Sequence, residues 1–374
     1  MKQTQRPLVV HSIDVGLGYV KHTKHLPDST IGFDSFPAIA IASDASFLKQ
    51  VGTRTRNTID VPVVGEDGVT SNYEVGKDVQ QAVISEFGRD VSASYYTSPI
   101  YEALMLGALR FTGAEVIDVL VLGLPVSQYL VHERRASLIE KWTRPEGVDT
   151  GNGRTVVIKD VIVRPQPLGG YAESLKHLDL IDQAIQASPA ATYMKKVTEA
   201  RQVIDMCVLV VDPGEFTLDW LVVNKGSIVE RASGAAEDAG RHRVVQAVTK
   251  ALEDKVGRQL PPVAHGRINQ SLLDGTPVKL SGEYHDLAQF AGAVKTAVND
   301  PVNKMYDGLK SVFEILDLIV VVGGHPKLYA AEVSSRFKSL PLVMLPEGVS
   351  VMANVAGFQD IGEAAAAQMA KKAA

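Results

Sequence analysis

The sequence has very little cysteine and few aromatic residues. Cys207 is the only cysteine among 374 residues, so the chain can form neither an internal disulfide nor a cysteine-based zinc cluster. It lies within an aliphatic run, which predicts a buried strand position rather than a nucleophile. With two Trp, ten Phe and eleven Tyr, the core must be built mainly from Val, Leu, Ile and Ala.

Long apolar runs and an excess of basic charge are also missing. No stretch approaches the roughly 18 consecutive apolar residues of a membrane span. The apolar run after residue 7 is too short for a signal peptide, so we expect a cytoplasmic protein. The 38 Lys and Arg against 43 Asp and Glu give a net charge of −5, which would repel a nucleic-acid backbone. We therefore expect neither a membrane nor a nucleic acid as a direct partner.

The length and the order of aliphatic and amphipathic segments predict two α/β domains. At roughly 150 residues per domain, 374 residues correspond to about two domains. Strands alternate with helices through most of the chain, which favours sheets covered by helices on both faces. The patterns predict strands at 8–15, 36–42, 61–64, 73–75, 116–124, 155–163, 206–211, 218–223, 318–322 and 340–344. They predict helices at 98–112, 127–141, 240–256 and 286–316, the last interrupted near 299–301, and helical stretches from 170 and from 353.

The most informative pattern is a near-repeat of an Asp-x-Gly turn. One copy begins at Asp14, after the first aliphatic run, and the other begins at Asp212, after the run at 206–211. The separation, 212 − 14 = 198 residues, is the size of a domain. In each copy a predicted strand delivers the turn, and a second predicted strand departs from it.

Such a turn suits a phosphate and its metal ion. Glycine lets backbone N–H groups approach a phosphate closely, and a carboxylate at a strand end can hold a hydrated Mg²⁺. Two such turns facing each other would clamp a nucleotide polyphosphate, with Lys21 neutralising phosphate charge and Thr217 donating a hydroxyl. Taken singly, each turn is better explained as a common β-turn, whereas the pair at matching strand ends favours a phosphate site. Neither a P-loop nor a dinucleotide-binding motif is present, since Lys21 stands where the latter needs a third glycine.

With these residues the sequence resembles the actin-like ATPase superfamily. Within it, the chain resembles the ParM/StbA group of plasmid-segregation actins, and most of all the ParM-like proteins D of the plasmid PRTRC system. The resemblance rests on ordered motifs: 14–21 as the first phosphate loop, 123–129 as the stretch with Leu-Pro and Tyr, 163–172 as the first crossing helix, 212–219 as the second phosphate loop, 319–326 as the adenosine motif and 353–358 as the second crossing helix.

The resemblance implies an α/β, actin-like (ribonuclease H-like) fold with two related domains flanking a nucleotide cleft. Because the last motif returns to the domain of Asp14, we expect a discontinuous first domain, 1–165 plus 341–374, and a second domain, 166–340. The implied function is an ATPase that hydrolyses ATP with Mg²⁺ and assembles into homopolymeric filaments for plasmid segregation. GTP is the open alternative nucleotide, and DNA would be contacted only through a DNA-binding adaptor protein.

The resemblance also implies the site residues. Asp14 and Asp212 would hold Mg²⁺ through water and act in catalysis together with Gln166, which would orient the attacking water. The implied nucleotide contacts are Gly16, Leu17, Gly18, Tyr19 and Lys21 in the first loop, Gly214, Glu215, Phe216 and Thr217 in the second, and Gly323, Gly324 and His325 in the adenosine motif. The chain departs from the family at Glu215 and Phe216, where small or hydroxylic residues are usual, and at His325, where a third glycine is usual.

Two other functions fit the same fold. A non-polymerising scaffold would bind nucleotide and recruit a partner protein, and the acid at Glu215 favours this reading because it sits beside the phosphates. A small-molecule kinase of the same fold would transfer phosphate to a sugar or an acid. Analogy of fold alone does not separate the three. We expect His22 and His25 to be surface residues rather than ligands.

Overall fold

The structure, a computed structural model, describes residues 6–28, 30–43, 56–79, 92, 94–280 and 282–373. The chain divides into two units, the first formed by Met1–Glu173 with Met352–Ala374 and the second by Ser174–Val351. The expected boundaries, after residues 165 and 340, fall earlier in the chain. Each unit is built on a mixed sheet with helices packed against it, so the α/β class expected from the sequence is confirmed.

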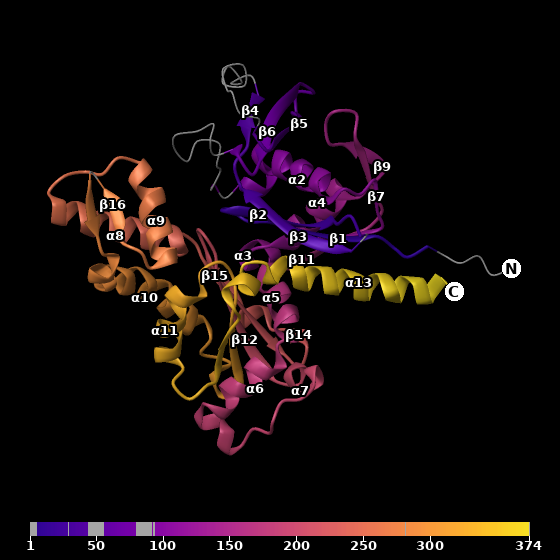
Figure 1. Ribbon diagram of the computed structural model, residues 1–374. Helices are drawn as coiled ribbons and strands as arrows, with labels where there is room; N and C mark the ends of the chain where they lie inside the picture. Colours follow the sequence, from indigo (N-terminus) through magenta and orange to yellow (C-terminus); the bar gives the residue numbers. More distant parts are fainter. Residues whose placement is uncertain are drawn as a thin grey trace. The chain divides into compact units, whose positions relative to one another are not determined.

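A five-stranded sheet forms the centre of the first unit (Figure 1). Its order is β11-β8-β1-β2-β3, with β1 at Val10–Val15, β2 at Tyr19–His25, β3 at Ile31–Pro37, β8 at Val119–Leu124 and β11 at Val161–Pro165. β1, β8 and β11 are parallel, whereas β2 and β3 run antiparallel to their neighbours. The strand that carries Asp14 therefore lies in the middle of the sheet.

Helices cover the two faces of this sheet. On one face α2 (Pro99–Thr112) packs against β1 and β2, and on the other α13 (Ala353–Ala373) packs against β1 and β8. The alternation of β1 explains both contacts, since Ile13 belongs to the core under α2 and Val10 belongs to the core with Phe358 of α13. The expected helix at 98–112 is confirmed, with Ser98 accepting a hydrogen bond from the Tyr101 N–H as its N-cap.

Smaller elements complete the first unit. One small sheet pairs β4 (Ile41–Ala42) and β5 (Thr58–Val64) with β6 (Thr70–Gly76), and another pairs β7 (Val116–Ile117) and β9 (Arg144–Asp149) with β10 (Thr155–Ile158). The helices are η3 (Tyr95–Thr97), α3 (Val126–Tyr129), α4 (His132–Trp142) and α5 (Gln166–Ser174).

Four predicted elements of the first unit are each divided in two. The predicted strands 36–42, 116–124 and 155–163 each cover parts of two strands that belong to different sheets, and the predicted helix 127–141 is α3 followed by α4. The break within 116–124 falls at Asp118, whose carboxylate accepts the Val9 N–H at 2.8 Å and pairs with Arg6. Because these contacts with the N-terminal segment hold Asp118, the strand is interrupted there, although the apolar sequence pattern looks continuous.

The sheet of the second unit repeats the order of the first. Written in the same direction as β11-β8-β1-β2-β3, its order is β19-β18-β12-β13-β14, and β15 also pairs with β13. The strands are β12 (Cys207–Pro213), β13 (Leu218–Asn224), β14 (Ser227–Ile228), β15 (Gly234–Ala236), β18 (Leu318–Val321) and β19 (Leu342–Met344). In both units the Asp-bearing strand lies between an antiparallel hairpin partner and a parallel strand. The predicted hairpin of 206–211 with 218–223 is confirmed.

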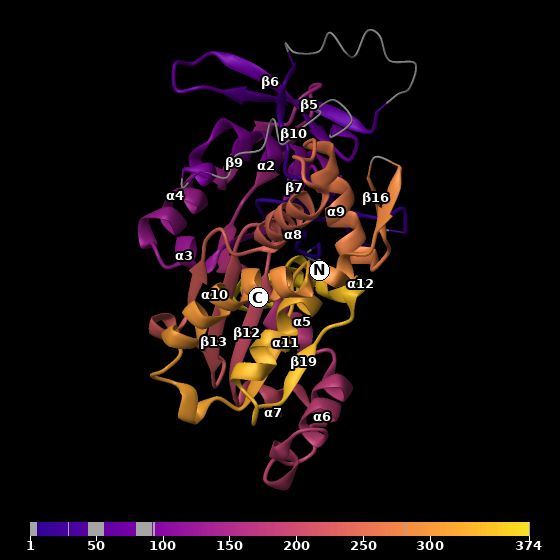
Figure 2. The same cartoon turned by 90° about the vertical axis from the view of Figure 1, so that its left-hand side faces the viewer.

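The helices of the second unit include four α-helices that the sequence patterns did not predict. They are α6 (Leu178–Gln186), η4 (Pro189–Thr192), α7 (Ala200–Ile204), η5 (Glu230–Ala232), α8 (Arg241–Val256), α9 (Val263–Asp274), η6 (Leu287–Phe290), α10 (Ala291–Gly308), η7 (Phe313–Ile315), α11 (Pro326–Arg336) and α12 (Glu347–Ser350), with a short hairpin of β16 (Val278–Leu280) and β17 (Glu283–His285). α7, α9, α11 and α12 were missed. α8 and α9 lie side by side, as Figures 1 and 2 show.

The predicted interruption of the helix near residues 299–301 is wrong. α10 runs through Pro301 without a break, and Val298, Val302 and Met305 are buried in the core of the second unit. Proline removes one backbone hydrogen bond from a helix, which costs several kcal/mol in an exposed helix. Here the burial of the apolar face around the proline offsets that loss.

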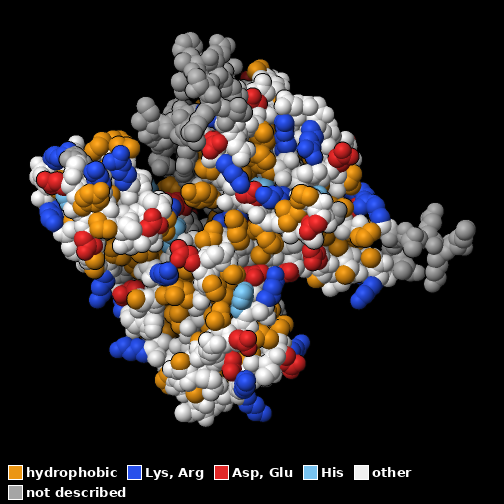
Figure 3. Space-filling model, viewed as in Figure 1, with side chains coloured by type: hydrophobic (Ala, Val, Ile, Leu, Met, Phe, Trp, Pro, Cys, Tyr) orange, Lys and Arg blue, Asp and Glu red, His pale blue; other side chains and the backbone are white. Residues whose placement is uncertain are grey.

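Cys207 is buried in β12, as the sequence predicted, with 3% of its surface exposed. Burial, and after it the nearby Asp317, raises the pKa of the thiol to about 11. The thiol is therefore protonated and unreactive near neutral pH. None of the helices in the described part of the chain is both long and apolar enough to span a membrane. On the face shown in Figure 3, basic, acidic and apolar side chains are interspersed.

Candidate functional site

The first Asp-x-Gly turn connects β1 to β2. Asp14 is the ladder partner of Lys21, and the Gly16 N–H donates to the Tyr19 carbonyl at 3.1 Å. A Cβ built at Gly16 would lie 3.1 Å from that same oxygen, so the turn leaves little room for a side chain. The carbonyl of Gly18 accepts the Ala38 N–H at 3.0 Å, which ties the turn to the end of β3.

Asp14 is buried and held by two of the residues predicted for the site. Only 1% of its surface is exposed. The Gln166 side-chain amide, at the start of α5, donates to Asp14 Oδ1 at 2.7 Å, and Lys21 Nζ lies 3.5 Å from Asp14 Oδ2. A buried carboxylate needs such partners, because an unpaired charge loses its hydration without compensation. The structure thus brings Asp14, Lys21 and Gln166 together.

A buried cluster of tyrosines, which sequence reasoning missed, contacts the backbone of this turn. The Tyr95 hydroxyl donates to the Gly16 carbonyl at 3.3 Å. The Tyr95, Tyr96 and Tyr101 rings pack edge to face, with centroids 5.1 to 5.4 Å apart. Burial, and after it the charge of Asp14, raises the pKa of the Tyr101 hydroxyl above its usual value. The cluster fixes the backbone of the turn without charge of its own.

The second turn has the same geometry. Asp212 pairs with Asp219 across the ladder, seven residues on as in the first turn, and the Gly214 N–H donates to the Thr217 carbonyl at 2.8 Å. The Thr217 hydroxyl, expected to serve a nucleotide, donates to Asp219 Oδ2 at 2.7 Å. Asp219 therefore occupies the ladder position that Lys21 has in the first unit.

A glycine on the neighbouring parallel strand makes room for each aspartate. A Cβ built at Gly123, at the end of β8, would lie 2.9 Å from Asp14 Oδ1. A Cβ built at Gly323, just after β18, would lie 2.1 Å from Asp212 Oδ1, and Gly323 has a φ of +86°. Sequence reasoning missed Gly123 as a site residue, although an aliphatic run ending in glycine about 110 residues after each aspartate is a readable signal.

The unusual residues of the second turn are paired with the start of α8. Both Nε, at 3.0 Å, and Nη2 of Arg241 donate to one carboxylate oxygen of Glu215. The Phe216 ring stacks on His242, with centroids 4.8 Å apart. His325 Nε2 lies 3.9 Å from the same Glu215 oxygen. Arg241, only 4% exposed, was not identified from the sequence.

The two predicted crossing helices contact each other through glycine. A Cβ built at Gly357 of α13 would lie 1.9 Å from the Gly169 carbonyl oxygen of α5, and one at Gly169 would lie 2.1 Å from the Asn354 carbonyl oxygen. The Ser12 hydroxyl of β1 donates to the Val355 carbonyl at 2.7 Å. This contact places the start of α5, and with it Gln166, against the strand that carries Asp14.

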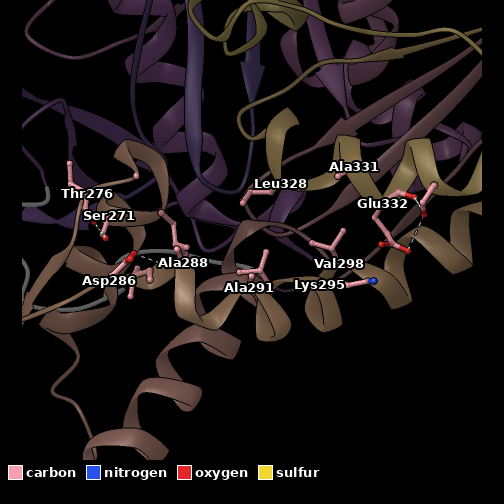
Figure 4. Close-up of a pocket in the computed structure, with 15 residues that line it drawn as sticks. Ser271, Thr276, Asp286, Ala288, Ala291, Lys295, Val298, Leu328, Ala331 and Glu332 are labelled. Carbon is pink, nitrogen blue, oxygen red and sulfur yellow. Dashed lines mark hydrogen bonds between the residues drawn. The ribbon is translucent and has the colours of Figure 1, made fainter. Parts of the chain in front are cut away.

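A cavity of about 570 Å³ lies in the second unit between α10 and α11. Val294 and Val298 of α10 and Leu328 and Ala331 of α11 line its apolar part, and Asp286 is among its polar lining residues (Figure 4). Leu328 belongs to the first turn of α11, the helix that begins directly after His325. The volume is in the range of cavities that hold small organic ligands.

The remaining residues singled out in the sequence differ in how far they are buried. Leu17 is half-buried against the core of the first unit, and Tyr19 is 42% exposed. At Gly324 no heavy atom of the described residues lies within 4 Å of a built Cβ. The expectation for His22 was wrong: it is 2% exposed and stacks on Phe111, because β2 lies under α2.

The aspartates suit a metal ion held mainly through water. Among the described residues no group of three or more His, Cys, Asp or Glu side chains could hold a metal directly. Asp14 and Asp212 nevertheless offer carboxylate oxygens at two strand ends, and Mg²⁺ keeps several of its waters when one or two carboxylates bind it. The chemistry of each carboxylate, taken by itself, therefore fits a hydrated Mg²⁺ better than a dehydrated transition metal.

Known proteins match this chain over part of its sequence and in fold. Residues 12–169 match the family model of the N-terminal domain of actin-like proteins. The fold is similar to that of Ta0583, an archaeal actin homolog, with a TM-score of 0.69, 18% identity and coverage of 96% of this chain and 100% of that one. A complex of Ta0583 with ADP matches with a TM-score of 0.65 and 19% identity over 96% and 100% of the two chains.

ParM proteins match as well. The 15-stranded ParM filament from Clostridium botulinum matches with a TM-score of 0.64 and 19% identity, over 96% of this chain and 100% of that one. The apo pSK41 ParM protein matches with a TM-score of 0.61 and 14% identity, over 97% and 99%. No curated protein sequence matches the chain. The chain therefore has the two-domain actin-like fold, and its residues 12–169 are similar to the N-terminal domain of the actin-like proteins.

Proposed function

We propose that this chain is an actin-like ATPase that binds ATP with Mg²⁺, hydrolyses it and assembles into filaments that segregate plasmids. The observation that carries the proposal is the recurrence of one turn in both units. Each turn follows the central strand of its sheet, has a buried aspartate at its start and is closed by the same glycine-to-carbonyl hydrogen bond. A duplicated phosphate turn suits a polyphosphate ligand, since two sets of backbone N–H groups can share its charge.

The residues of the turns divide the work of phosphate binding. Backbone N–H groups near Gly16, Gly18 and Gly214 would contact phosphate oxygens, and Lys21 would supply a positive charge. Asp14 and Asp212 would hold Mg²⁺ through its waters. The bound ion would neutralise charge on the β- and γ-phosphates. Phosphoryl transfer to water needs positioning and charge neutralisation more than covalent chemistry. Backbone N–H groups, a lysine and carboxylates that hold Mg²⁺ can supply both.

Gln166 would orient the attacking water. Its side-chain N–H donates to Asp14 at 2.7 Å, which fixes the direction of the amide. The amide carbonyl oxygen would then accept a hydrogen bond from the water. A neutral amide aligns the water without adding negative charge near the γ-phosphate. The role of Gln166 depends on the crossing of α5 and α13, which sets where α5 begins.

The cavity between α10 and α11 would hold the nucleotide base. It lies beside the first turn of α11, directly after the Gly323-Gly324 turn that resembles the adenosine motif. Its apolar lining would cover the faces of a purine ring, and its polar residues would meet the ring edge. Both ATP and GTP carry a purine, so GTP is the alternative nucleotide.

Self-association and an indirect contact with DNA complete the proposal. The similarity to a ParM filament supports assembly of copies of this chain. The net charge of −5 and the mixed surface charge favour a DNA-binding adaptor protein over direct contact with DNA. Membership of the PRTRC proteins D remains a prediction.

The direct test of the site is ATP turnover in the Asp212→Ala variant. We expect turnover to fall by about a hundredfold or more, because Mg²⁺ and the phosphates lose a buried ligand. Asp254→Ala, which removes an exposed carboxylate on α8, is the matched control and should hydrolyse ATP like the unmodified chain. Turnover retained in Asp212→Ala would remove the site assignment.

Two outcomes for the unmodified chain would favour the alternatives. Tight nucleotide binding without turnover or polymer would favour a nucleotide-binding scaffold. Transfer of the γ-phosphate to a sugar or an acid, rather than to water, would favour a small-molecule kinase.

A further inference from the structure

Two departures from the family pattern, 110 residues apart in the sequence, meet in the structure. Glu215 stands in the second turn, and His325 stands after the Gly323-Gly324 turn. One Glu215 oxygen lies 3.9 Å from His325 Nε2 and accepts two hydrogen bonds from Arg241. The side chains of Arg241 and Glu215 are 5% and 17% exposed, so water screens this ion pair poorly.

The backbone of the second turn is fixed on α8 at the same place. The Arg241 N–H donates to the Gly214 carbonyl at 3.1 Å, and the His242 N–H donates to the Glu215 carbonyl at 2.8 Å. A Cβ built at Gly240 would lie 2.4 Å from the Glu215 carbonyl carbon. The N-terminus of α8 therefore packs directly on the second Asp-x-Gly turn. The N-terminus of α8 has no side-chain cap of its own. The Glu215 carboxylate lies beside it and supplies the negative charge that stabilises a helix N-terminus.

An acid in a phosphate-binding turn raises an electrostatic problem. A unit charge about 7 Å from another repels it by about 2 kcal/mol at an effective dielectric constant near 20. Without compensation, Glu215 would weaken the binding of every nucleotide phosphate near the second turn. The contact of its carboxylate with a buried guanidinium removes most of this field, since the two charges sum to zero over a short distance.

We propose that Arg241 is a positioning residue of the nucleotide site that acts through Glu215. It compensates the charge of the carboxylate and holds it against the first helical turn of α8, and His325, after the Gly323-Gly324 turn, lies beside the same carboxylate. The pair thus replaces the small and hydroxylic residues usual in this turn. This inference rests on the proposed function, because it assigns a role to residues beside the second phosphate turn.

The test is a double-mutant cycle on nucleotide affinity, with MgADP and MgATP titrated into the full chain in a calorimeter. Arg241→Gln leaves Glu215 uncompensated, so the dissociation constant should rise about tenfold or more. Glu215→Gln combined with Arg241→Gln restores neutrality, and its dissociation constant should return to within about threefold of the unmodified chain. This return should occur even though both variants lose thermal stability, which separates positioning from a purely structural role.

Arg201→Gln is the control in the same unit. Arg201, on α7, pairs with Asp205, and neither residue belongs to the turns or to the lining of the cavity, so its loss should leave affinity unchanged. Arg241→Lys keeps a cation at the position but loses the two-donor contact, so its dissociation constant should lie between those of the unmodified chain and Arg241→Gln, which keeps the test usable if Arg241→Gln does not fold.

Three results would overturn the inference. Unchanged affinity in a folded Arg241→Gln variant would show that Glu215 needs no compensation. A double variant as weak as Arg241→Gln would show that Arg241 contacts the nucleotide itself. Absence of nucleotide binding by the unmodified chain would overturn the proposed function first, and this inference with it.

Discussion

At the scale of single residues, the site depends on where side chains are missing as much as on where they are present. Gly123 and Gly323 lie beside the buried carboxylates of Asp14 and Asp212, and a Cβ at either glycine would contact a carboxylate oxygen at 2.9 Å or less. The aspartates can be buried at strand ends because the next strand offers no side chain there. Burial in turn holds each carboxylate in one orientation, which a metal site needs.

Gly323→Ala should destabilise the second unit strongly. The residue has a φ of +86°, and the new methyl group would lie on Asp212 Oδ1, so we expect a loss of about 2 to 5 kcal/mol of unfolding free energy. Gly324→Ala is the neighbouring control. No heavy atom of the described residues lies within 4 Å of its new methyl group, and its effect should stay within about 0.5 kcal/mol. Urea unfolding followed by circular dichroism measures both, and equal midpoints for the two variants would refute the account.

The residues of the two turns could be predicted from the sequence, whereas their supports could not. Asp14 and Asp212 follow aliphatic runs and precede glycine, which is a local signal. Tyr95 and Arg241 act through contacts with segments 79 and 26 residues away, and no local pattern marks such a partner. Gln166 was found through the family resemblance, and the structure places its amide on Asp14.

At the scale of elements, the two hairpins and the crossing of α5 with α13 position the site. The hairpins were predictable because short aliphatic runs flank a glycine turn. The breaks at Asp118 and the continuity of α10 through Pro301 were not predictable, because contacts from other segments decide both. α9 was missed because its start follows two prolines in a stretch that resembles a loop.

Gly357→Ala should disturb the crossing of α5 and α13. Its methyl group would overlap the Gly169 carbonyl, so the helices must separate, and we expect a loss of about 2 kcal/mol or more together with weaker nucleotide binding. Gly292→Ala, in α10, is the matched control because no described heavy atom lies within 4 Å of its new Cβ. Replacing a helical glycine by alanine there should be neutral or stabilise by up to about 1 kcal/mol. Thermal melts and nucleotide titration report the two effects, and a Gly357→Ala variant that behaves like Gly292→Ala would contradict the proposed helix contact.

At the scale of the whole molecule, the sequence and the structure agree on two α/β units built on one plan. The order of strands recurs between the units, and the Asp-x-Gly repeat identified the centre of that plan. The exact unit boundaries were less predictable, since α5 runs from the last strand of the first unit to the beginning of the second without a linker signal. The surfaces through which copies would assemble were not predictable either, because exposed residues carry no periodic pattern.

The central claim is that nucleotide bound at the two turns drives assembly of this chain. Sedimentation of the purified chain with MgATP, MgADP or no nucleotide, over a range of salt concentrations and with electron microscopy of the pellets, tests it most directly. We predict filaments in the pellet with MgATP, and their loss in Asp212→Ala but not in Asp254→Ala. A chain that stays in the supernatant under every nucleotide and salt condition would contradict the claim.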